Sequence, residues 1–279
     1  MLKVSELYIY PIKSLAGIAV DSALLTDRGF KYDRRWLLVD ENNIFFTQRE
    51  FHQMALLQVE LINDGLKVYH KQNIQSQLTI PAIPETNERA TVQIWNDRCE
   101  AQFVSKSVDE WFSQMLSFKC RLVYMPDTSR RRIDERYSIN EEITSFSDSH
   151  PILIIGQSSL DDLNIRLADP LPINRFRPNI VFTGGEAFEE DVMEHFTIND
   201  IDFYGVKLCI RCMITTINQD NAVAAKEPLK TLATYRMKNN NIYFGQNLLH
   251  HGEGTISVGE AIEIKKKKLS KNSPLTIDY

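Results

Sequence analysis

Hydrophobic and polar positions alternate over short stretches of the chain, and turn-forming residues separate these stretches. Asn63-Asp64-Gly65 is one such turn and Gly259-Glu260 is another. Alternation with a period of two predicts strands, and turn residues between two such runs predict a hairpin. The expected hairpin partners are residues 36–40 with 44–48, 58–62 with 66–70, 91–95 with 99–104, and 255–258 with 261–265. Antiparallel sheet is therefore expected rather than a series of strand–helix–strand units.

Helical signals are few. Ser107 and Glu110 have the spacing of a capping box, and Ser159 with Asp162 marks a second helix start, each followed by apolar residues at helical intervals. Pro228 suits the first position of a third helix. The expected fold class is α+β and mostly β.

A change in composition suggests where the chain divides. The apolar run 122–125 gives way to a polar, charged segment that extends to about residue 144. We therefore expect a first domain over residues 1–125, a second over 126–268, and a tail over 269–279.

Composition excludes several classes of protein. The 279 residues are 43% hydrophobic and carry a formal net charge of −5, which disfavours a basic nucleic-acid binder. Four cysteines are too few for a disulfide scaffold. We find neither a signal peptide nor an apolar run long enough for a membrane helix, so no membrane partner and a cytoplasmic location are expected.

The cysteines at 209 and 212 form an isolated Cys-x-x-Cys. A structural zinc site needs a second pair of ligands nearby, and Cys99 and Cys120 do not supply one. The apolar flanks 201–208 and 213–217 predict a strand, in which the two thiols would face opposite ways. From the strand alone, Cys212 is either a buried core residue or a single thiolate ligand to a soft metal.

Several short motifs follow one another in a specific order. They are Tyr10-Pro11-Ile12-Lys13-Ser14, Asp27-Arg28-Gly29, residues 33–40, Thr47-Gln48-Arg49, residues 174–181, Cys209-Ile210-Arg211-Cys212 with Thr215-Thr216, and Phe244-Gly245-Gln246-Asn247. The ordered set resembles the MOSC family. More narrowly, it is similar to two-part proteins in which an N-terminal β-barrel domain precedes the MOSC domain, such as the mitochondrial amidoxime-reducing component and its bacterial relatives.

The resemblance implies an N-terminal β-barrel-like domain followed by a MOSC β-barrel with a few helices. It also implies a molybdenum cofactor, a pterin that carries a phosphate and holds molybdenum through a dithiolene. Cys212 matches the family's metal ligand and is the expected catalytic residue. The expected cofactor-binding residues are Lys13, Ser14, Arg34, Ser149, Arg177, Asn179 and Asn247.

The implied activity is the reduction of N-hydroxylated compounds, namely hydroxylamines, amidoximes and N-hydroxylated bases. Iron–sulfur clusters need about four suitably placed thiolates. Electrons are therefore expected from a separate redox protein such as ferredoxin or flavodoxin, which the basic stretches 130–136 and 265–271 could dock. Two alternatives stay open: Cys212 carries sulfur as a persulfide, or the protein stores the cofactor without turnover.

Overall fold

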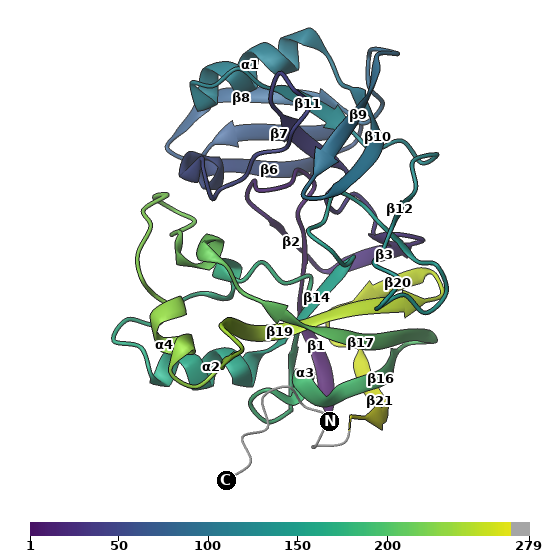
Figure 1. Cartoon of the computed structure of the whole chain (residues 1–279), viewed down its shortest axis with the longest axis vertical. Helices are drawn as coiled ribbons and strands as arrows, with labels where there is room; N and C mark the ends of the chain where they lie inside the picture. The colour runs from purple at the N-terminus through teal and green to yellow at the C-terminus, as the bar shows by residue number, and fades with distance from the viewer. Residues whose placement is uncertain (269–279) are drawn as a thin grey trace.

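The computed structural model describes residues 1–268, and strands dominate it (Figure 1). The strands are β1 (Leu2–Ile9), β2 (Ile18–Val20), β3 (Ser22–Thr26), β4 (Gly29–Phe30), β5 (Trp36–Val39), β6 (Leu57–Ile62), β7 (Gly65–His70), β8 (Asn73–Pro81), β9 (Arg89–Ile94), β10 (Asp97–Phe103), β11 (Arg121–Tyr124), β12 (Arg131–Arg132), β13 (Ile143–Thr144), β14 (Ile152–Gly156), β15 (Ile180–Thr183), β16 (Met193–Ile198), β17 (Ile201–Ile210), β18 (Met237–Lys238), β19 (Asn241–His251), β20 (Gly254–Ser257) and β21 (Ala261–Lys267). The helices are α1 (Lys106–Leu116), α2 (Gln157–Ile165), α3 (Glu189–Val192) and α4 (Leu229–Ala233), with short 3-10 turns η1 (His52–Leu56), η2 (Ile173–Arg175) and η3 (Met213–Thr216).

Seven strands close into a barrel. Their order is β14, β15, β1, β21, β16, β17 and β19, and β19 pairs back to β14. All of these pairs are antiparallel except β14 with β15. Phe196, Phe203 and Leu248 are fully buried in the core of the barrel. The predicted MOSC-type barrel is confirmed, and the first strand of the chain is one of its members.

Two further sheets make the other half of the molecule, the upper half in Figure 1. One has the order β5-β11-β10-β9 and the other β6-β7-β8. Helix α1 buries Val108, Phe112 and Leu116 in the core that these sheets share with Trp36. The mostly β architecture expected from the sequence is confirmed.

The hairpin predictions had mixed outcomes. Strands β6 with β7 and β9 with β10 form the two expected hairpins. The hairpin expected around residue 42 is reduced to a turn with one antiparallel bridge, between Val39 and Phe45, and residues 44–48 form no strand. The C-terminal hairpin is wrong: β20 pairs with β3, whereas β21 pairs with β16 and β1.

The helix starts also differ in detail from the predictions. The side chain of Ser105, not Ser107, accepts the capping hydrogen bond of α1 from the Val108 N–H. Helix α2 begins at Gln157, and the Ser159 hydroxyl is turned inward to donate to Glu190. The Ser107 hydroxyl instead bonds to that of Ser105, and the Ser159 hydroxyl shows that a serine can satisfy a tertiary partner rather than a helix end.

The position of the domain border stays a prediction. Strands β1, β3 and β4, which precede residue 31, belong to sheets that include strands from the second half of the chain. The tail 269–279 lies outside the described residues. Within residues 1–268, no helix is long and apolar enough to cross a membrane.

Candidate cofactor site

A cavity of about 230 Å³ is lined by loop residues of the N-terminal half and by residues of the barrel strands β14, β17 and β19. All eight predicted site residues line it: Lys13, Ser14, Arg34, Ser149, Arg177, Asn179, Cys212 and Asn247. These residues are up to 234 positions apart in the chain, as far as Lys13 is from Asn247. The location of the predicted set is therefore consistent with one site, and the roles of its members stay predictions.

Tight backbone turns present three of the cavity residues. Ser14, Arg34 and Arg177 have φ angles of 67°, 49° and 55°. Residues other than glycine seldom adopt this left-handed conformation, and they keep it only where the surrounding structure holds them. Residues in such conformations cluster at functional sites. The main chain provides some of that support, since the Arg34 N–H donates to the Tyr10 carbonyl oxygen.

Tyr10 packs between two cavity arginines. The guanidinium carbons of Arg34 and Arg177 lie 4.4 and 4.3 Å from the centre of its ring. Arg34 donates to Asp33 at 2.6 Å and to the Asn179 side-chain oxygen at 3.0 Å. Burial lowers the pKa of Arg177 to about 10, and no carboxylate in residues 1–268 pairs with it. Arg177 is thus a largely desolvated cation whose charge Asp33, Asp148 and Tyr10 offset only in part.

The side-chain amide of Asn179 hydrogen-bonds to other groups of the protein. Its oxygen accepts from Arg34 and from the Leu153 N–H, and its nitrogen donates to the Tyr8 carbonyl oxygen. The side chain therefore orients Arg34.

Lys13 is the second buried cation. Its ammonium donates to the Phe146 carbonyl oxygen and to Asp148, each at 2.7 Å. Burial lowers its pKa to about 8, because attraction to Asp148 offsets only part of the cost of desolvation. Partial desolvation opposes the charge on Asp148 as well, but Lys13 and Arg49 outweigh it and hold the pKa of Asp148 far below its ordinary value.

Positive charge dominates the lining of the cavity. The lining cations are Lys13, Arg34, Arg49, Arg177, Lys207 and Arg211, whereas Asp148 is the one lining carboxylate among the described residues. Arginine presents a planar fork of donors that matches phosphate, and buried cations attract an anion strongly. The donor set therefore suits a ligand that carries a phosphate.

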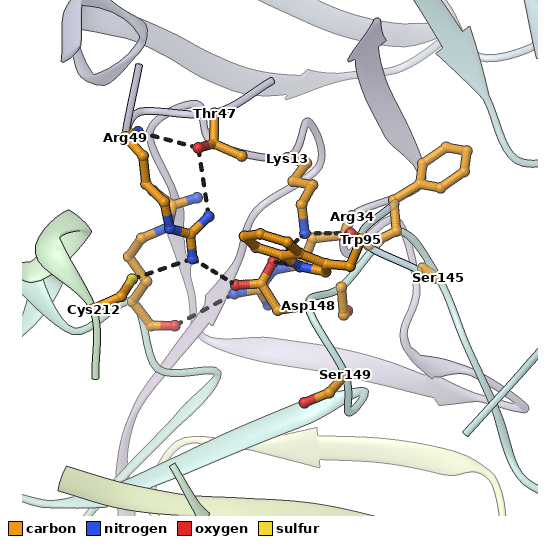
Figure 2. Close-up of polar contacts among 12 residues, drawn as sticks. Lys13, Arg34, Thr47, Arg49, Trp95, Ser145, Asp148, Ser149 and Cys212 are labelled. Carbon is orange, nitrogen blue, oxygen red and sulfur yellow. Dashed lines mark hydrogen bonds and ion pairs between the residues drawn. The ribbon is translucent and has the colours of Figure 1, made fainter. Parts of the chain in front are cut away.

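The thiols lie on the same cavity. Strand β17 ends at Ile210 and η3 begins at Met213, so the predicted strand over 213–217 is wrong. Because the chain turns after Ile210, Cys209 and Cys212 both line the cavity instead of facing opposite ways. Arg49 donates to the Cys212 sulfur at 3.2 Å (Figure 2), and Arg211 donates to the Cys209 sulfur at 2.9 Å.

The other two cysteines are remote from this chemistry. Cys99 and Cys120 are buried in the N-terminal half, and burial raises the pKa of each thiol to about 11. In residues 1–268, no group of three or more His, Cys, Asp or Glu side chains is placed to hold a metal.

The sequence missed several lining residues. Arg49 was noted in the Thr47-Gln48-Arg49 motif without a role, and nothing singled out Asp148, His150 or Lys207. The neighbouring Arg35 and Arg175 do not line the cavity, and the roles of Arg34 and Arg177 stay predictions. Arg35 binds Asp127, and Arg175 donates to the Thr215 carbonyl oxygen.

The two basic stretches have internal partners. Arg131 is buried and binds Asp97. The lysines at 265, 266 and 267 pair with Glu263, Glu194 and Glu189 respectively. These lysines are nevertheless exposed, as are Arg130, Arg132 and Arg136, so the docking role stays a prediction; Lys271 lies outside the described residues.

Comparison with known proteins matches both halves of the chain. The MOSC N-terminal beta barrel domain matches residues 1–119, and the MOSC domain matches residues 141–263. Mitochondrial amidoxime-reducing component 1 of Mus musculus is 30% identical over 93% of this chain and 81% of its own length. The same component of Homo sapiens is 31% identical over 93% and 82%. Mitochondrial amidoxime reducing component 2 of Bos taurus is 32% identical over 84% and 72%. The chain therefore belongs to the MOSC family, in the group that combines an N-terminal MOSC β-barrel domain with a MOSC domain.

Proposed function

We propose that the protein is a molybdenum cofactor-dependent reductase of N-hydroxylated compounds. One observation carries the proposal: a single cavity is lined by the Cys212 thiol, by the buried Lys13 and by Arg177, and the charges of both cations are only partly compensated. The cations suit the phosphate of a pterin cofactor and the thiol suits a soft metal. The relatives described above are named for amidoxime reduction, which is the same class of reaction.

Each lining residue then has a physical role. Lys13, Arg34 and Arg177 would bind the phosphate, and Asn179 would hold Arg34 in place. The hydroxyls of Ser14 and Ser149 and the amide of Asn247 would donate to or accept from the polar edge of the pterin. The Cys212 sulfur would ligate the metal. When bound, the cofactor supplies the two-electron chemistry that cleaves an N–O bond, and the protein supplies placement and electrostatics.

Electrons would come from a separate redox protein of the ferredoxin or flavodoxin type. Four cysteines, two of them buried and remote, leave no set of thiolates in residues 1–268 for an iron–sulfur cluster. We further propose a cytoplasmic location, although the relatives are named as mitochondrial.

The test measures metal, pterin and activity in one preparation. The protein is purified from a host that makes the cofactor and is assayed for benzamidoxime reduction with a chemical electron donor, which removes any dependence on the natural partner. Cys212→Ala should abolish activity while the fold persists. Cys209→Ala is the matched control, because it removes the other thiol of the cavity. Full activity in Cys212→Ala would overturn the proposal, and extra sulfur on Cys212 without metal would favour the persulfide carrier.

A further inference from the structure

Trp95 occupies an unusual position at the edge of the cavity. It lies in the two-residue turn between β9 and β10, and its φ angle is 54°. A bulky side chain is uncommon in this left-handed conformation, where glycine or asparagine is usual. The residue is nevertheless 45% exposed, so burial in the hydrophobic core does not account for it.

The contacts of Trp95 are directed at two cavity residues. Its ring centre lies 4.7 Å from the Arg49 guanidinium carbon, and its indole N–H donates to the Asp148 carboxylate at 3.2 Å. Phe45 packs edge-on against the same ring at 5.0 Å. Figure 2 shows the indole beside Arg49 and over Asp148. The β9–β10 turn of the N-terminal half thus contacts two residues that line the cavity.

Arg49 is the residue that Trp95 would hold. Its terminal nitrogen donates to the Cys212 sulfur at 3.2 Å and lies 3.4 Å from Asp148. Arg49 follows Thr47 in a segment without a regular helix or strand, so secondary structure does not fix its side chain. Fixing a long side chain costs rotamer entropy, and contacts on several sides are needed to offset that cost.

We propose that Trp95 is a positioning residue, which holds the Arg49 guanidinium between the Cys212 sulfur and the Asp148 carboxylate. The inference rests on the proposed function, because it concerns the sulfur expected to ligate the metal. Groups that hydrogen-bond to a metal ligand orient it and tune the metal. Loss of the indole should therefore free Arg49 and change the environment of the sulfur without removing the sulfur itself.

The experiment uses the cofactor-loaded enzyme and variants of the turn. Trp95→Gly removes the indole at a φ angle that glycine accepts, so the turn itself is not strained. Trp95→Phe keeps an aromatic face for Arg49 but loses the N–H. Asn96→Ala is the control, since it alters the other turn residue, which is exposed. Arg49→Ala, alone and combined with Trp95→Gly, completes a double-mutant cycle.

Three measurements separate positioning from a structural role. We expect Trp95→Gly to lower kcat/KM about tenfold, equivalent to about 1.4 kcal/mol, with Trp95→Phe intermediate and Asn96→Ala unchanged. The electron paramagnetic resonance spectrum of the bound metal should shift in Trp95→Gly at unchanged metal content. In the Arg49→Ala background, Trp95→Gly should have almost no further effect.

The possible failures are distinguishable. If the wild type is active but Trp95→Gly has an unchanged spectrum and rate, the role of Trp95 is overturned and the proposed function stands. Full additivity in the double-mutant cycle has the same meaning. A wild type without molybdenum or reductase activity overturns the proposed function instead.

Discussion

Replacing Lys13 by methionine should change how the stability of the cofactor-free protein depends on pH. Lys13 is buried, and its pKa falls from 10.5 to about 8 in the folded state. The difference of about 2.5 pH units corresponds to roughly 3 kcal/mol of unfavourable free energy for the charged form, at about 1.4 kcal/mol per unit. This free energy is the cost of keeping a cation ready for an anion.

The sign of the effect follows from proton linkage. Above pH 8 the folded wild type releases the Lys13 proton while the unfolded chain keeps it up to pH 10.5, so the wild type gains stability with rising pH. We therefore compare the free energies of unfolding of Lys13→Met and the wild type. The value for Lys13→Met minus the value for the wild type should fall above pH 8, by about 1.4 kcal/mol per pH unit.

Urea unfolding of cofactor-free protein at pH 7, 8, 9 and 10 measures this difference. Lys106→Met, at a lysine whose side chain is 91% exposed, controls for the loss of one lysine. Saturating sulfate should move the onset of the fall to higher pH, because a bound anion stabilises the charged form of Lys13. A difference that stays constant from pH 7 to pH 10 would refute the reasoning that Lys13 is incompletely compensated.

Two further predictions concern the barrel. Burial, aided by Asp191, raises the pKa of Glu190 from 4.5 to about 7, so stability should be lost as pH rises from 4.5 to about 7. Glu190→Gln should therefore gain about 3 kcal/mol over the wild type between pH 4 and pH 8 in urea unfolding; no gain would contradict this. At Gly205 a Cβ would lie 1.9 Å from the Gln246 amide nitrogen and 2.1 Å from the Met193 carbonyl oxygen. Gly205→Ala should therefore fail to form the barrel, and a native circular dichroism spectrum with an unchanged melting temperature would contradict this.

Turn residues and alternating hydrophobic positions predicted the hairpins whose two strands are neighbours in the sequence. The Asn63-Asp64-Gly65 turn and its alternating flanks form a hairpin as expected. The partner of a strand is set by contacts distant in sequence, and no local pattern reports it. Hence β1 in the barrel and the pairing of β20 with β3 were not foreseen.

The predicted site depended on the ordered motifs. The motifs selected Lys13, Arg34 and Cys212, which all line one cavity. The spacing of single residues could not have selected them. Asp148 and Trp95 lie in a loop and at a turn, where hydrophobic periodicity gives no signal. The relation between the two thiols was misread because the strand ends at Ile210, two residues before Cys212.

Molybdenum and pterin analysis of the purified protein tests the central claim most directly. The protein should be produced in a host that makes the cofactor, beside Cys212→Ala and Arg177→Met. The account predicts about one molybdenum and one pterin per chain in the wild type, loss of pterin in Arg177→Met, and loss of the metal–sulfur signature in Cys212→Ala. Wild-type protein that lacks both molybdenum and pterin, from a host that loads another molybdenum enzyme in parallel, would contradict it.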